Sequence, residues 1–165
     1  YWGVDQTHGP QLKRYLSEVQ PGVVPTTWWA REVAGHTHGA RAELRALFGT
    51  TGVFDTPKPV ELIQRLLRVA SGPDTLVLDF FAGSGTTAHA VMRQNAEDGG
   101  RRGVVLVQTP EPIDPGRKPE ISAEYPTIAH VMRERVRRSA SSVSREFPHW
   151  DPPAVTSLRV ESYPG

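Results

Sequence analysis

An apolar run that leads directly into a glycine turn constrains the fold of this chain more than any other feature. Residues 75–81 read Thr-Leu-Val-Leu-Asp-Phe-Phe, the turn at residues 82–85 reads Ala-Gly-Ser-Gly, and a helical pattern follows over 86–96. Such apolar runs are typical of strands buried on both faces of a parallel sheet. A second apolar run at 103–107 completes a strand–helix–strand unit with an expected right-handed crossover. The sequence therefore predicts an α/β fold of parallel strands with flanking helices.

The rest of the chain divides into an irregular first region, residues 1–53, and a more regular part, residues 54–165. Apolar positions three and four residues apart predict further helices, which span residues 11–19, 40–48, 59–70 and 126–143. Residues 110–124 are predicted to form a loop rich in Pro and charge, and the alternation over 154–162 predicts a third strand. Trp28 and Trp29 are expected in the core, because large aromatic side chains mostly supply buried area.

Composition excludes several classes of protein. The absence of cysteine rules out a disulfide framework and a cysteine-ligated zinc or iron–sulfur site. No apolar run approaches the roughly 18 residues of a membrane span, and the start at Tyr1 carries no secretory signal, so a cytoplasmic protein is expected. His36 and His38 have a spacing suited to a metal, but no third ligand lies close in sequence, so no metal site is predicted.

The glycine turn indicates a ligand site. Gly83 and Gly85 let a ligand approach the main chain, and the following helix presents its N–H groups and positive dipole end. The Gly-x-Gly-x-x-Ala spacing also fits a dinucleotide fingerprint. Against a nicotinamide cofactor, Asp79 would repel a pyrophosphate, and Gln108 stands where an acidic residue for the ribose is expected. A ligand with a positive group is favoured; the alternative is that Asp79 only caps the turn.

Several stretches resemble one enzyme family. Residues 78–91, Leu-Asp-Phe-Phe-Ala-Gly-Ser-Gly-Thr-Thr-Ala-His-Ala-Val, resemble the S-adenosylmethionine motif of amino-type DNA methyltransferases, in particular the adenine-N6 modification subunits of type III restriction–modification systems. Residues 54–63 are similar to the cofactor motif that lies just before it in that family. The other similar stretches are residues 1–3, 22–28, 106–112 and 128–138. The resemblance implies part of a Rossmann-like, S-adenosylmethionine-dependent methyltransferase fold.

The resemblance also implies which residues bind S-adenosylmethionine. Asp79 would lie near the ammonium group of its methionine part, while Lys58 would face the carboxylate from the opposite side. Gln108 or Glu111 would meet the ribose or adenine. The predicted cofactor-binding residues are Phe54, Thr56, Lys58, Asp79, Phe80, Ala82, Gly83, Gly85, Thr86, Thr87, Gln108 and Glu111. For Lys58, a solvated surface cation between two prolines is the alternative.

The second constellation that such enzymes need is not found in this chain. The nearest match to the family's Asp-Pro-Pro-Tyr-type tetrapeptide is residues 151–154, which end in Ala154 and so have no ring to stack a flipped base. In the family's motif order, that tetrapeptide also precedes the cofactor turn. No catalytic residue is therefore predicted here. We expect the C-terminal, cofactor-binding part of a longer methyltransferase, inactive alone; a stand-alone cofactor- or nucleotide-binding module that assists a partner subunit is the alternative.

Partners are implied mainly by the resemblance, since the formal net charge of +1 favours none. In the intact enzyme they would be duplex DNA, a second copy in a homodimer and a restriction subunit. Arg133, Arg135, Arg137 and Arg138 predict a basic helix face, with Arg101 and Arg102 nearby. Such a face suits DNA phosphates, and equally a solvated surface with local partners such as Glu134.

Overall fold

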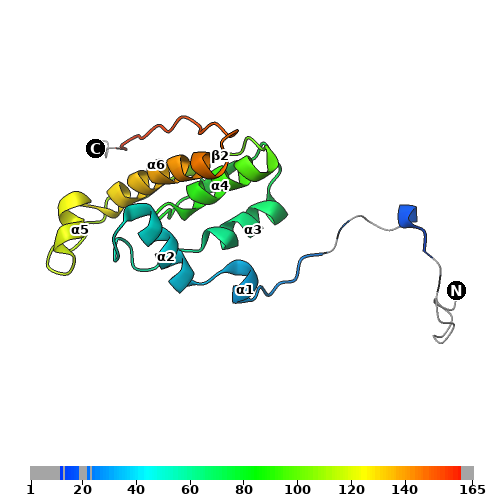
Figure 1. Cartoon of the computed structure of the whole chain (residues 1–165), viewed down its shortest axis with the longest axis horizontal. Helices are drawn as coiled ribbons and strands as arrows, with labels where there is room; N and C mark the ends of the chain where they lie inside the picture. Colours follow the sequence, from blue (N-terminus) through cyan, green and yellow to red (C-terminus); the bar gives the residue numbers. More distant parts are fainter. Residues whose placement is uncertain (1–11, 13, 19–21, 23, 161–165) are drawn as a thin grey trace, which may run out of the picture.

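The computed structural model describes residues 12, 14–18, 22 and 24–160, so the resemblance at residues 1–3 lies outside the described part. In chain order, the elements are η1 (Leu16–Glu18), α1 (Arg31–Ala34), α2 (Thr37–Phe48), α3 (Val60–Ala70), β1 (Leu76–Asp79), α4 (Thr86–Asp98), β2 (Gly103–Leu106), α5 (Pro119–Glu124) and α6 (Ile128–Glu146). Figure 1 shows α4 lying between α3 and α6, and α2 beside α5. Among the described residues, no helix has the length and apolar character needed to cross a membrane.

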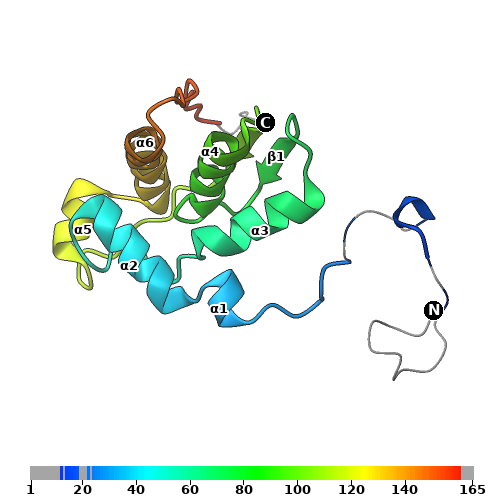
Figure 2. The ribbon, with the colours of Figure 1, turned by 45° about the vertical axis from the view of Figure 1, so that its right-hand side comes forward.

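The predicted strand–helix–strand unit is present. β1 and β2 pair in parallel, with Leu76 opposite Gly103 and Asp79 opposite Leu106, and α4 connects them. Within the described residues this sheet has two strands. The fold is therefore a mixed helix–strand arrangement around a small parallel sheet, and Figure 2 shows β1 alongside α3 and α4.

Helices cover one face of this sheet. Val77 of β1 and Val104 of β2 pack against a buried cluster of α3 and α4 that contains Val60 and Val91. On the other face, Leu76 and Leu78 are 67% and 51% exposed. The prediction of a strand buried on both faces is therefore wrong for this chain, because no described element packs on the second face.

α6 connects two parts of the core. Along one side it packs on α4, where Val136 and Val143 meet Ala88 and Met92. Near its start, Val131 joins a second cluster that contains Leu44 and Phe48 of α2, Ile121 of α5 and Tyr125 just after α5. The rings of Phe48 and Tyr125 meet edge to face, with centroids 5.6 Å apart. The cluster also contains Val53, with Phe54 packed against it, so it holds α2 beside the segment that leads toward α3.

Other segments differ from the prediction. The supposed loop at 110–124 contains α5, which begins with Pro119 at its first turn and buries Ile121. Residues 154–160 form no strand and are exposed, and residues 161–162 lie outside the described part. The predicted helix over 11–19 is reduced, in its described residues, to η1. Trp28 is 77% exposed rather than in the core, while Trp29 lies under the guanidinium of Arg65.

A buried polar network joins the end of α4 to the start of β2. The Asn95 side chain donates to the Arg102 carbonyl and accepts from its N–H, at 2.9 and 3.1 Å. The Arg102 guanidinium donates to Asp98 at 3.0 Å and to Ser71 at 3.0 Å. Burial opposes ionisation of Asp98, but hydrogen bonds from Arg102, Gln94 and the Gly100 N–H outweigh it and lower the Asp98 pKa to about 2. The network fixes the turn that brings the chain back to β2.

Stability should fall in acid because of Asp98 and Glu134. Hydrogen bonds from Arg137 and Arg138 overcome burial and hold the pKa of Glu134 at about 2, well below its usual value. A carboxyl with a depressed folded-state pKa contributes stability that is complete above its unfolded pKa and is lost as the pH falls toward the folded one. The urea midpoint is therefore expected to drop between about pH 4.5 and pH 2. Glu134→Gln should flatten that drop; an unchanged pH profile in this variant would contradict the assignment.

Candidate functional site

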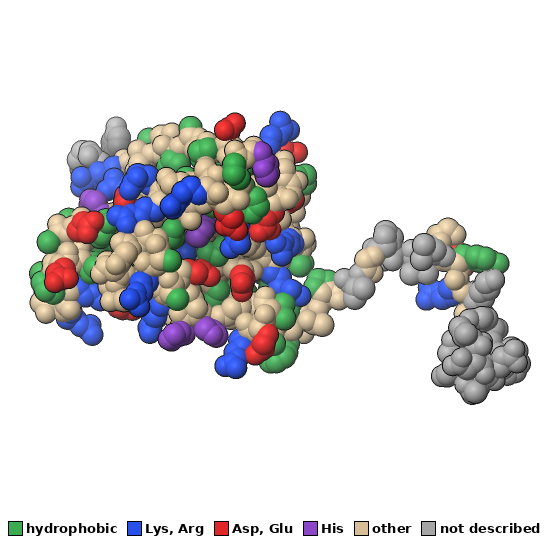
Figure 3. All heavy atoms as spheres, in the orientation of Figure 1, with side chains coloured by type: hydrophobic (Ala, Val, Ile, Leu, Met, Phe, Trp, Pro, Cys, Tyr) green, Lys and Arg blue, Asp and Glu red, His purple; other side chains and the backbone are tan. Residues whose placement is uncertain are grey.

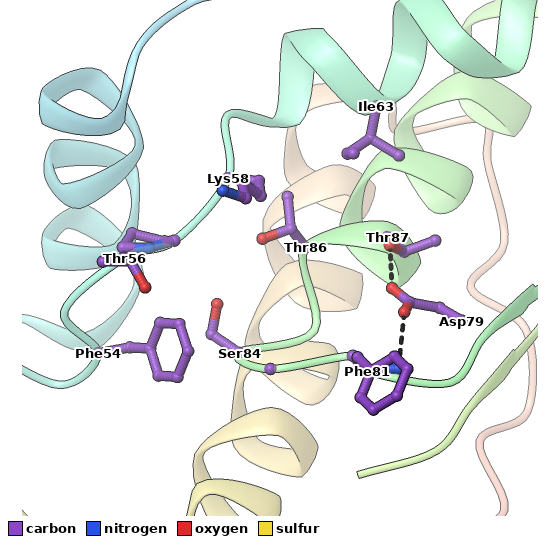
Figure 4. Close-up of a pocket in the computed structure, with 12 residues that line it drawn as sticks. Phe54, Thr56, Lys58, Ile63, Asp79, Phe81, Ser84, Thr86 and Thr87 are labelled. Carbon is purple, nitrogen blue, oxygen red and sulfur yellow. Dashed lines mark hydrogen bonds between the residues drawn. The ribbon is translucent and has the colours of Figure 1, made fainter.

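A cavity of about 380 Å³ opens beyond the C-terminal end of β1. This volume lies in the range of small-molecule sites, roughly 300 to 1,000 Å³. The lining residues are Phe54, Thr56, Pro57, Lys58, Ile63, Asp79, Phe81, Ala82, Gly83, Ser84, Thr86 and Thr87. The cavity is therefore built from two stretches, 54–63 and 79–87, which Figure 4 shows on opposite sides of it.

The first stretch forms a stiff wall. Pro57 and Pro59 flank Lys58, and each proline fixes its own backbone φ, so the segment enters α3 in an extended form. Pro59 has φ −63° and is the N-cap residue that directly precedes α3. The Lys58 side chain is exposed at the cavity, and its ammonium has no hydrogen-bond or ion-pair partner among the described residues. This wall thus presents a free positive charge.

The second stretch is the glycine turn. Gly83 has φ +53°, and a Cβ there would lie 3.3 Å from Cζ of Phe54, so the turn approaches the first wall closely. The Gly83 N–H donates to Oε1 of Gln108 at 2.7 Å, which ties the turn to the end of β2. Gly85 has φ +82° and stands at the start of α4. A Cβ on Gly85 would lie 3.1 Å from Cγ of Met132, so this glycine serves contact with α6 rather than with the cavity.

Asp79 already accepts two hydrogen bonds within the turn. Its Oδ1 accepts from the Phe81 N–H at 3.1 Å, and its Oδ2 accepts from the Thr87 hydroxyl at 2.5 Å (Figure 4). These bonds cap the turn, as the alternative interpretation of Asp79 expected. A carboxylate has about four acceptor positions. Asp79 therefore keeps the capacity to accept from a cationic ligand in the cavity that it lines.

The structure brings together most of the predicted site residues. Eight line the cavity, namely Phe54, Thr56, Lys58, Asp79, Ala82, Gly83, Thr86 and Thr87. Four lie outside the lining: Phe80, which is 62% exposed, Gly85 against α6, Gln108 behind Gly83, and Glu111, which accepts from the Thr109 hydroxyl. The lining residues that the prediction missed are Pro57, Ile63, Phe81 and Ser84. Strand alternation was a usable signal for Phe81, since it stands two residues after Asp79.

The predicted basic helix face is only partly present. Arg135 is completely buried, and Arg138 lies over the Phe48 ring while donating to the Leu47 carbonyl at 3.0 Å. Arg137 pairs with Glu134. Arg102 is buried as well. Figure 3 shows blue and red side chains interspersed over the visible face rather than a single basic surface. The prediction was wrong for Arg135, because the helical pattern alone did not reveal that it turns inward. It was also wrong for Arg102, which lies between α4 and β2 and is held there by Asn95 and Asp98.

Burial changes the charge behaviour around the turn. It lowers the pKa of Arg135 to about 10. Burial, reinforced by the positive charges of Arg135 and Arg93, lowers the pKa of His89 to about 3, so this imidazole is neutral at physiological pH. Beneath the turn, the buried charge of Arg135 therefore lies near a neutral histidine.

The histidine pair at the start of α2 has a structural contact. Nδ1 of His36 accepts from the Gly39 N–H at 2.8 Å and so caps the start of α2. Within residues 24–160 and the other described positions, no group of three or more His, Cys, Asp or Glu side chains is placed to hold a metal ion.

Comparison with known proteins identifies the family. A family model described as DNA methylase matches residues 4–108. The chain belongs to the DNA methylase family. Both stretches that line the cavity fall within the DNA methylase match, whereas α6 and its buried Arg135 lie beyond it.

Curated relatives of the DNA methylase chain extend the likeness. The type III restriction-modification enzyme StyLTI Mod subunit of Salmonella typhimurium is 40% identical over 148 residues, 90% of this chain and 22% of that protein. The EcoPI Mod subunit of Escherichia phage P1 is 38% identical over 122 residues, 74% of this chain and 18% of the relative. The type II methyltransferase M.KpnI of Klebsiella pneumoniae is 41% identical over 102 residues, which are 62% of this chain and 24% of that protein. The predicted resemblance to type III modification subunits is confirmed, and the chain spans less than a quarter of these relatives' length.

Proposed function

We propose that this chain is the cofactor-binding part of a site-specific DNA methyltransferase that transfers methyl from S-adenosylmethionine to adenine N6 in a restriction–modification system. The observation that carries the proposal is the convergence of residues 54–63 and 79–87 on one cavity, since both stretches resemble the family's cofactor motifs. The match to the DNA methylase family supports duplex DNA as the substrate, and the names of the relatives, which describe modification subunits and a methyltransferase, support methyl transfer.

The residues of the cavity fit S-adenosylmethionine in charge and shape. The cofactor carries an ammonium and a carboxylate on its methionine part. Asp79 supplies free acceptor positions for the ammonium, and the unpaired Lys58 supplies a cation for the carboxylate. A Cβ on Gly83 would lie 3.3 Å from the Phe54 ring, so a glycine at this position keeps the turn close to the first wall and suits contact with a ligand through the main chain.

In this proposal, the chain's own residues bind and orient the cofactor. The bound cofactor would supply a transferable methyl group on its sulfonium sulfur. Phe54, Ile63 and Phe81 supply apolar surface to the cavity. Asp79 and Lys58, placed on opposite walls, fix the direction of the methionine part (Figure 4). No residue of this chain is proposed to act on the adenine.

We also propose that the chain functions as the C-terminal part of a longer protein that supplies the Asp-Pro-Pro-Tyr-type motif, and that it is inactive alone. The exposed second face of the sheet supports this, since Leu76, Leu78 and Val105 there are 67%, 51% and 44% exposed. Contiguous exposed apolar side chains mark surfaces that contact protein. The small fraction of each relative that the chain spans also supports it. A homodimer and a restriction subunit would complete the assembly.

Calorimetric titration of the full-length gene product tests the proposal. S-adenosylhomocysteine is expected to bind with a stoichiometry of one per chain, and NAD is expected not to bind. A preference for NAD would overturn the cofactor assignment. Methylation of adenine N6 in duplex DNA by the same preparation, followed by mass spectrometry of the nucleosides, tests the reaction; methylation of cytosine N4 instead would overturn the substrate.

Lys58→Gln is expected to weaken S-adenosylhomocysteine binding roughly tenfold, because it removes a charged hydrogen bond worth about 1.5 kcal/mol. Asp79→Asn should weaken it in the same range. The matched control is Arg45→Gln, which removes an exposed cation of α2 that does not line the cavity. Titration calorimetry checks all three variants. Equal affinities in Lys58→Gln and the control would mean that Lys58 is an ordinary surface cation.

A further inference from the structure

Arg135 is a buried cation that no carboxylate among the described residues contacts. Its side chain extends from α6 and is completely buried. Its Nη1 donates to Oγ of Ser84 at 2.8 Å and to Oγ1 of Thr86 at 2.7 Å. Its Nε and Nη2 are buried without a hydrogen-bond partner in the described part of the chain. The ion pairs found there do not include it. A buried unpaired charge costs several kcal/mol, so its presence calls for a reason.

The carboxylate of Glu43 only weakly offsets the cost of burying the Arg135 charge. Glu43 of α2 raises the pKa of Arg135, but burial dominates and lowers it. Burial also raises the pKa of Glu43, whose oxygen accepts from the Val60 N–H at 3.4 Å. Glu43 therefore serves the start of α3 and makes no ion pair with the guanidinium. The positive charge beneath the glycine turn is left for a further anion to balance.

The hydrogen bonds from Arg135 determine whether the hydroxyls of Ser84 and Thr86 act as donors or acceptors toward other groups. A guanidinium only donates, whereas a hydroxyl has one hydrogen and two acceptor lone pairs. Ser84 and Thr86 therefore accept from Arg135 and keep their own hydrogens for another acceptor, and neither hydroxyl donates to a group within the described residues. Both residues line the cavity, and Figure 4 shows their oxygens pointing into it, toward the wall of Thr56 and Lys58.

We propose that Arg135 is a positioning residue that sets the Ser84 and Thr86 hydroxyls as hydrogen-bond donors to a ligand carboxylate in this cavity. The buried guanidinium polarises both hydroxyls, which strengthens the bonds that they donate to an anion. Lys58 approaches the same anion from the opposite wall, and the start of α4 adds the positive end of its dipole. The inference rests on the proposed function, because it identifies this carboxylate with that of the cofactor's methionine part.

The test compares two ligands in the full-length gene product. S-adenosylhomocysteine carries the carboxylate, and its decarboxylated analogue keeps the adenosine, the sulfur and the ammonium. Arg135→Met is expected to weaken S-adenosylhomocysteine roughly ten- to a hundredfold, the range of a lost charge-assisted hydrogen bond, and to change the analogue by less than about twofold. Arg135→Lys, which keeps the charge, should recover part of the loss. The control, Arg137→Met on the exposed side of α6, should change neither affinity.

A second variant separates positioning from folding. Ser84→Ala with Thr86→Val keeps Arg135 but removes both donors. Like Arg135→Met, it should weaken S-adenosylhomocysteine far more than the decarboxylated analogue, so that the two affinities become similar. Equal weakening of both ligands by the Arg135 and double variants, or no weakening of S-adenosylhomocysteine, would overturn the inference while leaving the proposed function intact. Absence of binding of either ligand to the unaltered protein would instead overturn the proposed function, and the inference with it.

Discussion

Gly85→Ala is expected to lower the free energy of unfolding by roughly 2 to 4 kcal/mol. Two costs add at this position. A left-handed backbone costs an alanine about 1 kcal/mol or more, and Gly85 has φ +82°. The new Cβ would also lie 3.1 Å from Cγ and 3.3 Å from the carbonyl oxygen of Met132, so α4 or α6 has to move. Overpacking of this kind typically costs 1 to 3 kcal/mol.

Gly99→Ala is the matched control for this prediction. Gly99 has φ +70° at the other end of α4, and a Cβ there meets nothing within 4 Å. This variant should lose only the backbone cost, about 1 kcal/mol. Urea unfolding followed by circular dichroism measures both variants. Equal losses would show that α6 yields to the added methyl and that contact with Met132 does not restrain the turn.

Gly83→Ala should affect ligand binding more than stability, in contrast to Gly85→Ala. Its φ of +53° also disfavours alanine, but the nearest atom to the new Cβ is Cζ of Phe54, at the end of a side chain. Because Phe54 and Gly83 both line the cavity, a displaced ring changes the cavity more than the core. We expect a smaller stability loss than for Gly85→Ala and a larger loss of S-adenosylhomocysteine affinity, checked by unfolding and calorimetry on the same samples.

Local patterns were sufficient to predict the centre of the fold. The apolar run before Asp79, the glycines at 83 and 85 and the helical spacing after them describe consecutive residues, so their signals need no tertiary knowledge. The parallel pairing of β1 with β2 followed from the length of the α4 connection. The same local glycine signal assigned Gly85 to ligand contact. The signal did not show that α6 packs against Gly85, because α6 is distant in the sequence.

The features that depend on distant partners were missed. Alternation at 154–162 predicted a strand, but in residues 154–160 no neighbouring strand pairs with it. Arg135 occupies the row of α6 that also contains Val131 and Ser139, each four residues away and each fully buried. Its position in that row was a usable signal, which its charge masked, since arginine is seldom fully buried. Predicting it required knowledge that the turn hydroxyls lie opposite.

Truncation of a side chain on the exposed face of the sheet should cost little stability in this chain and much more in the full-length gene product. In the 165-residue chain, Leu78 is 51% exposed, so Leu78→Ala should cost no more than about 0.5 kcal/mol. In the full-length gene product, where we propose that further methyltransferase structure covers this face, the same change should cost about 2 to 4 kcal/mol, as for a buried leucine. The contrast arises because burial of the side chain, rather than its identity, determines the loss.

Val77→Ala provides the control on the opposite face of the same strand. Val77 packs against the α3–α4 cluster in the chain itself, so its truncation should cost the same in both contexts. Urea unfolding of the two proteins, each with both variants, gives the four losses needed. A Leu78→Ala loss below about 0.5 kcal/mol in the full-length protein would mean that this face stays in solvent. The chain would then be a module that binds its cofactor without the remainder of an enzyme packed on its sheet.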